Sequence, residues 1–178
     1  LEKLRDAGLA APADPAPSNQ YLERLFDEGW LDEAVEQTNA FLNLHAGHPG
    51  SRGILLKAAS AAAEMGDERA AQRFLDLAGS DGLNDQEKLA TADVLVELGD
   101  LTKARTIYEE RLKSAPENAA ALIGLGRTAL KSNQIEAAEK TLRRAIAVAP
   151  DSAAAHAALG LALTQKLDLA SARVEFEA

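Results

Sequence analysis

The sequence predicts an all-α fold built from about five short helix-turn-helix units, and two observations carry that prediction. Hydrophobic residues make up 47% of the 178 residues, but aromatic residues only 4%. The apolar content is mainly Ala and Leu, which favour helix over strand because they lose little side-chain entropy in a helix. In addition, "SAPENAAALIGLG" at residues 114–126 recurs as "VAPDSAAAHAALG" at 148–160, 34 residues later. This repetition predicts an array of units that bury apolar surface against their neighbours.

The first 19 residues are predicted to form a lead-in or linker. The stretch "AAPADPAPSN" at 10–19 carries Pro12, Pro15 and Pro17. Proline lacks a backbone N–H and restricts the residue before it, so this composition argues against a regular element. The repeat array is expected to cover residues 20–178.

Five units follow when the chain is aligned on one small residue of each second helix. These aligned residues are Ala34, Ala71, Ala104, Ala138 and Ala172. A turn precedes each of them, because Gly and Asn adopt the left-handed conformation in which helices commonly end. The predicted turn formers are Gly29, Gly66, Gly99, Asn133 and Asp168. The units are predicted near 20–48, 52–84, 85–118, 119–152 and 153–178, the last of them incomplete.

Prolines mark two of the unit boundaries. Pro116 and Pro150 each precede a polar pair whose second member, Asn118 or Ser152, is suited to cap the next helix. Each predicted helix is about a dozen residues long, which is too short for a stable isolated helix in water. The units must therefore stack on one another to fold.

A helix-turn-helix of 34 residues with small residues at set places and a closing proline resembles the tetratricopeptide repeat. The resemblance covers residues from about 20 to 178 and is weakest in the first unit, where Leu22 and Phe41 replace small residues. It implies a right-handed superhelix whose concave face is lined mainly by the first helix of each unit. The unit at 119–152 fits best, with matches at Leu122, Leu125, Gly126, Ala129, Ala138, Leu142, Ala145 and Pro150.

The repeat has a packing rationale, and it also predicts an open end. Gly126 and Gly160 lack a side chain, so the first helix is expected to approach its partner closely at these places. The chain stops at Ala178 inside a predicted second helix, so we expect the full protein to continue. We also expect an exposed face near Leu159, Leu163 and Phe176 that contacts another molecule.

Composition argues against several classes of function. There are 19 Lys and Arg against 28 Asp and Glu, a net charge of −9, whereas nucleic-acid and anionic-membrane surfaces need clustered positive charge. The acidity is concentrated in residues 1–89, with 8 basic and 16 acidic residues, while 90–178 hold 11 and 12. The absence of cysteine excludes disulfides and thiolate metal sites. No apolar run is long enough to span a membrane, and the compartment stays open between cytoplasm and periplasm.

No catalytic or metal-binding set is predicted. The "HAGH" stretch places His45 and His48 three residues apart, but it contains Gly47, precedes Pro49 and has no further ligands nearby, so a polar turn is expected. His156 is expected to be a packed side chain. The "GLG" at 124–126 lies within a predicted helix and is not a phosphate loop. We therefore predict a protein that is not an enzyme and uses no cofactor or metal.

The candidate binding site is the concave groove that the resemblance implies. It presents an apolar stripe flanked first by acids and later by two bases, which suits a peptide or helix with apolar anchors and oppositely charged ends. An alternative is that Leu89 and Ile123 only support packing between first helices. The predicted groove residues are Leu56, Ser60, Glu64, Leu89, Asp93, Glu97, Ile123, Arg127, Lys131 and Leu161.

The expected function is that of a bacterial, non-catalytic scaffold for protein–protein interaction. Three alternatives remain at this stage. The chain could self-assemble into homo-oligomers through its uncovered C-terminal end. It could be the regulatory arm of a larger enzyme, or it could serve an envelope system such as pilus or secretion assembly.

Overall fold

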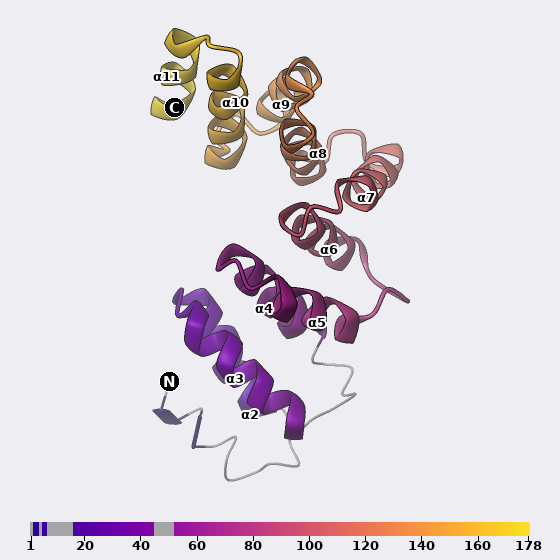
Figure 1. Cartoon of the computed structure of the whole chain (residues 1–178), viewed down its shortest axis with the longest axis vertical. Helices are drawn as coiled ribbons and strands as arrows, with labels where there is room; N and C mark the ends of the chain where they lie inside the picture. Colours follow the sequence, from indigo (N-terminus) through magenta and orange to yellow (C-terminus); the bar gives the residue numbers. More distant parts are fainter. Residues whose placement is uncertain (1, 4, 7–15, 45–51) are drawn as a thin grey trace. The chain divides into compact units, whose positions relative to one another are not determined.

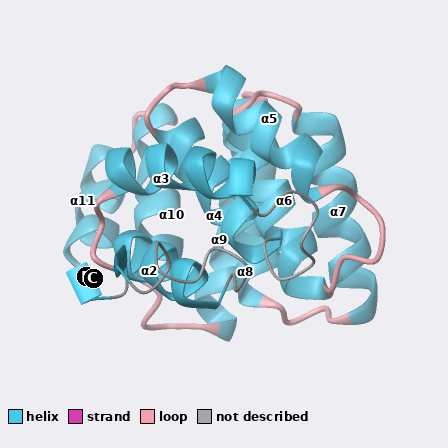
Figure 2. Cartoon of the chain, turned by 90° about the horizontal axis from the view of Figure 1, so that it is seen from below, coloured by secondary structure: helices cyan, strands magenta, loops and turns pink. Residues whose placement is uncertain are grey.

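The computed structural model describes residues 2, 3, 5, 6, 16–44 and 52–178. Over these residues the regular secondary structure is helical and contains no strand (Figures 1 and 2). The helices follow one another as five pairs, which confirms the all-α class and the helix-turn-helix organisation. The pairs are α2 (Ala16–Asp27) and α3 (Leu31–Leu44), α4 (Arg52–Glu64) and α5 (Glu68–Ala78), α6 (Asp85–Glu97) and α7 (Leu101–Ser114), α8 (Ala119–Lys131) and α9 (Ile135–Val148), and α10 (Ala153–Gln165) and α11 (Leu169–Glu177).

The chain divides into two compact units, Leu1–Ala90 and Thr91–Ala178, and each is described by itself. In the N-terminal unit, α2 begins at Ala16, ahead of residue 20, the predicted start of the array. Pro17 is compatible with this start, because N–H groups in the first turn of a helix have no intrahelical partner. Residues 16–19 are therefore helical rather than linker, while Pro12 and Pro15 lie outside the described residues.

Every first helix ends in the same hydrogen-bonded turn. A backbone N–H just after the helix donates to the carbonyl five residues earlier, which is the bond that characterises a Schellman ending. This ending requires a residue of positive φ, and Gly29, Gly66, Gly99 and Asn133 supply it, with φ of 77°, 79°, 80° and 56°. Four of the five predicted turn formers are thus confirmed. The N–H···O bonds, 2.8–2.9 Å long, run from Trp30 to Leu25, Asp67 to Ala62, Asp100 to Leu95, Gln134 to Ala129 and Asp168 to Leu163.

The fifth predicted turn former, Asp168, is wrong. The residue of positive φ is Leu167, at 67°, whereas Asp168 has φ −85° and caps α11 by accepting a hydrogen bond from the Ser171 N–H at 3.2 Å. Leucine adopts the left-handed conformation only at a cost of about 1–2 kcal/mol. The spacing of the repeat imposes the turn at Leu167 against its local preference, and its side chain is 82% exposed.

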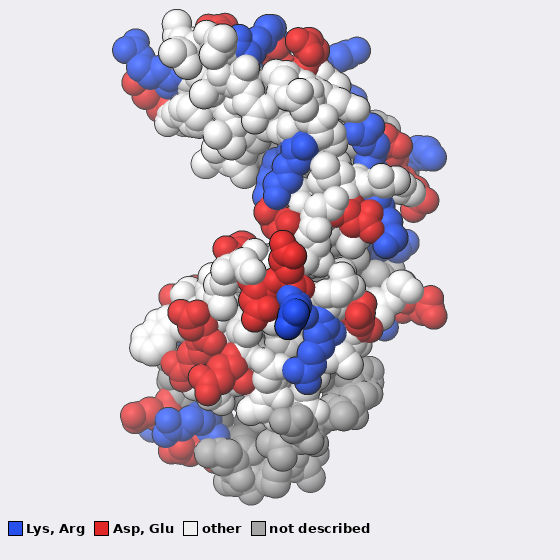
Figure 3. Space-filling view, in the orientation of Figure 1, with Lys and Arg blue, Asp and Glu red and all other residues white. Residues whose placement is uncertain are grey.

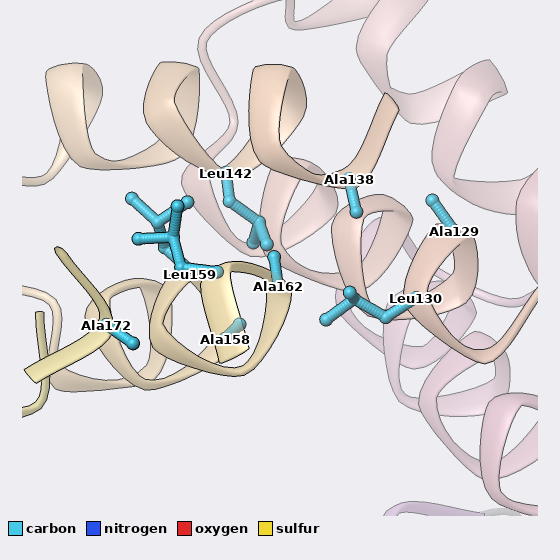
Figure 4. Packing of buried hydrophobic residues seen from close by; sticks show 9 residues of the cluster. Ala129, Leu130, Ala138, Leu142, Ala158, Leu159, Ala162 and Ala172 are labelled. Carbon is cyan, nitrogen blue, oxygen red and sulfur yellow. The ribbon is translucent and has the colours of Figure 1, made fainter. Parts of the chain in front are cut away.

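The aligned small residues lie at the centre of the packing. Ala34, Ala71, Ala104, Ala138 and Ala172 are all between 0% and 3% exposed. The predicted caps also form, since Asn118 accepts from the Ala121 N–H at 2.8 Å and Ser152 from the Ala155 N–H at 3.3 Å. In the C-terminal unit one apolar cluster joins four consecutive helices, α8 to α11 (Figure 4). Its buried members are Ala129, Leu130, Ala138, Leu142, Ala158, Leu159, Ala162, Leu163 and Ala172.

This cluster corrects the prediction for the C-terminal end. Leu159 and Leu163 are 1% and 2% exposed, so they do not lie on an open face. They are buried because the cluster surrounds them with Ala138 and Leu142 of α9 and Ala172 of α11. Phe176, in contrast, is 54% exposed.

Three glycines on first helices make room for large side chains of second helices. A Cβ on Gly126 would lie 2.5 Å from Cγ of Leu142, and one on Gly160 would lie 2.6 Å from the Phe176 ring. A Cβ on Gly124 would meet the Tyr108 ring at 2.3 Å. These contacts show why the "LG" of each unit recurs, as the sequence predicts for Gly126 and Gly160.

The three glycines should respond differently to alanine. Gly→Ala in a helix gains about 1 kcal/mol of intrinsic helix propensity, which a steric clash can outweigh by about 1–3 kcal/mol. Leu142 is fully buried and cannot move aside, whereas the half-exposed Phe176 can. We expect Gly126→Ala to lower the urea midpoint of unfolding, followed by circular dichroism, and Gly160→Ala to leave it unchanged or raise it. Equal losses in both variants would contradict this account.

Candidate protein-binding surface

The predicted groove residues fall in both compact units, four in the N-terminal and six in the C-terminal one. In the N-terminal unit, Leu56 is only 3% exposed, so α4 does not present it to a partner in this structure. Ser60 and Glu64 lie one turn apart on α4, where the Ser60 hydroxyl donates to Glu64 Oε1 at 3.5 Å. Leu89 on α6 is half-buried.

The C-terminal unit brings three of its predicted residues together in what we call the Glu97 cluster: Glu97, Arg127 and Lys131. Arg127 Nη2 lies 2.5 Å from Glu97 Oε1, and Lys131 Nζ lies 2.7 Å from Glu97 Oε2. Lys131 Nζ also donates to the Val96 carbonyl at 3.3 Å. The cluster ties α8 to the end of α6 across about 30 residues of sequence. The two cations, 43% and 42% exposed, are more accessible than Glu97, at 27%, so the cluster presents positive charge to solvent.

Asp93 lies one turn before Glu97 and is held from the other side. The Tyr108 hydroxyl of α7 donates to Asp93 Oδ1 at 2.7 Å. Burial raises the pKa of the Asp93 carboxyl above its ordinary value of 3.8, while the Tyr108 hydrogen bond and the Arg127 charge act in the opposite direction. Burial and the Asp93 charge also raise the pKa of Tyr108 far above 10, so the phenol stays neutral and remains a donor.

Two apolar residues complete the predicted set in this unit. Ile123 on α8 is half-buried against the cluster of Leu122, Ala145 and Ala155, which supports the alternative that it contributes to packing. Leu161 on α10 is 54% exposed. Because α8 and α10 contact each other, Leu161 belongs to the same surface as the first-helix cations.

Charge is distributed unevenly between the two units. Residues 1–90 hold 8 basic and 16 acidic side chains, and residues 91–178 hold 11 and 12. Figure 3 shows acidic side chains gathered over the N-terminal part of the chain on the face in view. An acidic partner would therefore be favoured at the C-terminal unit and disfavoured at the N-terminal one.

His156 is a packed side chain, as predicted, but it also carries out a specific polar role. Its Nδ1 lies 2.7 Å from Glu175 Oε2 on α11, and its Nε2 lies 2.8 Å from the Pro150 carbonyl oxygen. Both partners are acceptors, so both ring nitrogens must carry protons. The hydrogen bond to Pro150 and then that to Glu175 raise the pKa of His156 above 6.5. The charged imidazole joins α11 to α10 and to the preceding turn.

The described residues contain no group of three or more His, Cys, Asp or Glu that could hold a metal ion. His45 and His48 lie outside these residues. Among the described helices, none combines the length and the apolar character that crossing a membrane requires.

Sequence reasoning missed several exposed apolar residues at the last repeat. Leu167 is 82% exposed, Leu169 is 64% exposed and Val174 is 60% exposed. A signal for the first of them was present, because the turn place that holds Gly or Asn in the other units holds Leu here.

Residues 95–162 match the family model described as tetratricopeptide repeat. No curated protein matches the chain in sequence.

Solved structures share the fold over most of the chain. MamA from Desulfovibrio magneticus RS-1 is 20% identical, with a TM-score of 0.62 over 90% of this chain and 89% of that one. TTC0263, a tetratricopeptide repeat protein of Thermus thermophilus, is 16% identical, with a TM-score of 0.73 over 92% and 89%. YrrB, described as a tetratricopeptide repeat protein with an unusual peptide-binding site, is 15% identical, with a TM-score of 0.62 over 98% and 89%. At these identities the likeness shows the fold alone.

The buried Asp93 should make stability depend on pH in a defined direction. A raised pKa in the folded state means that stability increases as pH falls from the raised value toward 3.8, because the folded protein takes up the proton first. Asp93→Asn keeps an oxygen acceptor for Tyr108 and removes the charge, so we expect it to be more stable than wild type at pH 7. Urea midpoints should show this advantage shrinking as pH falls to about 4. Tyr108→Phe should instead lose about 1–3 kcal/mol at pH 7, because it leaves a buried carboxylate without its donor.

His156 should release α11 when it loses its proton. With its pKa raised in the folded state, its contribution is complete below 6.5 and disappears as pH rises through the folded value. We expect hydrogen exchange of α11 amides, corrected for intrinsic rates, to accelerate over that range. In His156→Gln, α11 should exchange fast at every pH. An NMR titration that placed the pKa of His156 at or below 6.5 would contradict the charged arrangement.

Proposed function

Residues 95–162 belong to the tetratricopeptide repeat family, and from that premise we propose that the protein is a non-catalytic scaffold for another protein. It binds a peptide or helix of that partner across the first helices of the C-terminal unit, α6, α8 and α10. The observation that carries the proposal is the Glu97 cluster, in which two half-exposed cations share one less exposed carboxylate.

The surface combines the two kinds of contact that peptide recognition needs. Arg127 presents a planar guanidinium with several N–H donors, and Lys131 presents an ammonium; both can bind a carboxylate of the partner. Leu161 offers an exposed apolar contact on the neighbouring helix. A segment with an acidic residue followed or preceded by an apolar one therefore complements this face.

Rigid support from behind favours this surface as a binding site. Asp93 is fixed by the Tyr108 hydroxyl, and the Tyr108 ring lies against Gly124 of α8. The helices that carry the cluster are thus joined by contacts beneath it. Side chains held in place before binding lose less conformational entropy when a partner arrives.

The test is affinity capture from a lysate of the source organism with matched charge variants. Arg127→Gln with Lys131→Gln removes the two cations of the proposed surface. Lys113→Gln with Lys140→Gln removes two exposed cations of the second helices α7 and α9 and serves as the control. We expect a partner that wild type and the control retain and that the first variant loses, with circular dichroism showing both variants folded. Retention of the same proteins by both variants, or capture of none by wild type, would overturn the proposal.

A further inference from the structure

The last helix, α11, exposes side chains at places that earlier second helices cover. Leu101, Ile135 and Leu169 begin the second helices of the last three repeats at 34-residue intervals. Leu101 and Ile135 are half-buried, whereas Leu169 is 64% exposed. Seven residues later, Tyr108 and Leu142 are 1% and 0% exposed, but Phe176 is 54% exposed.

The covered face of α9 shows what kind of element fits such a place. Helix α10 packs against α9, and Ile135 lies against the apolar cluster to which α10 contributes Ala158 and Ala162. These alanines are four residues apart and form one face of the helix. Their small size lets the two helix axes approach closely, so the complementary element is a helix with a strip of small residues.

A polar residue between the two apolar places reaches the turn of the next repeat. On α7, Arg105 Nη2 donates to Gln134 Oε1 at 2.8 Å. On α9, Glu139 Oε2 lies 2.8 Å from Lys166 Nζ. The equivalent residue on α11 is Arg173, whose side chain is 78% exposed and lies 3.7 Å from the exposed Glu177. By the same geometry Arg173 can reach a carboxylate in a turn that follows a docked helix.

The face is carried by a helix that is already held in place. The Phe176 ring contacts α10 at Gly160, and Glu175 pairs with His156 of α10 at 2.7 Å. Leu169, Arg173 and Phe176 lie four and then three residues apart, so they share one side of α11. We call these three residues the α11 face.

We propose that the α11 face binds an α-helix of a partner protein in the way that α9 holds α10. The helix bears Ala or Gly at positions three or four residues apart, and an Asp or Glu just beyond its C-terminal end pairs with Arg173. This site is separate from the Glu97 cluster and does not depend on the proposed function.

A second copy of the chain does not supply such a helix from α2. The α2 residues equivalent to Ala158 and Ala162 are Gln20 and Arg24, both exposed, long and polar. The equivalent of Lys166 is Glu28, and Arg24 already pairs with it at 2.6 Å. These side chains would hold the two helix axes apart, whereas the α11 face requires close approach.

The test uses peptides that copy α10. A labelled peptide of residues 152–168 with Lys166→Glu is stapled between positions 157 and 161, both exposed in α10, because an unstapled helix of this length is marginal in water. Fluorescence anisotropy should show that wild-type protein binds it and binds the unsubstituted Lys166 peptide about tenfold more weakly. On an Arg173→Glu protein this preference should reverse. No binding of either peptide, or a preference that Arg173→Glu leaves unchanged, would overturn the proposal.

Matched variants of α11 separate this face from the rest of the helix. Leu169→Ser should abolish binding, whereas Val174→Ser, with similar exposure on another side of α11, should retain it. Sedimentation velocity of the protein alone supplies the last check, with a monomer expected. Self-association that Leu169→Ser removes would assign the face to a second copy and overturn the proposal of a partner helix.

Discussion

Each close contact between helices in the C-terminal unit depends on one steric constraint. A large side chain of a second helix must lie where the first helix has no side chain or only a methyl group. Leu142 against Gly126 and Phe176 against Gly160 meet the constraint within a repeat, and Tyr108 against Gly124 meets it between repeats. The constraint explains a composition rich in Ala and poor in aromatic residues, because many helices must approach closely and few places can hold a ring.

The polar surface follows from this packing. Since Gly124 admits the Tyr108 ring, the Tyr108 hydroxyl can reach Asp93 on α6. Asp93 lies one turn from Glu97, which in turn holds Arg127 and Lys131 of α8. A steric fit in the interior therefore sets where two half-exposed cations stand on the surface. The buried carboxyl and the neutral phenol are parts of that support and not signs of catalysis.

A repeat structure also contains its own reference for what is incomplete. The same three places are occupied on α7, α9 and α11, and the first two helices show each place in contact with a following helix. On α11 the places hold an exposed Leu, an exposed Arg and a half-exposed Phe. The internal comparison specifies the shape and charge of a complementary helix more closely than exposure alone, since single exposed apolar residues are common on protein surfaces.

The sequence by itself determined the features that depend on local backbone chemistry. Gly29, Gly66, Gly99 and Asn133 favour the left-handed turn, Asn118 and Ser152 favour helix caps, and Ala and Leu favour helix, so element type and repeat length were predictable. Tertiary structure decided the rest. Leu159 and Leu163 are buried because α9 and α11 cover them, and Leu56 is buried although its repeat place suggested an open groove. Leu167 adopts the left-handed turn against its own preference because the repeat spacing requires a turn there. The pairing of Arg127 with Glu97, 30 residues away, depends on where flexible side chains meet in space, which a one-dimensional pattern of small and apolar residues does not specify.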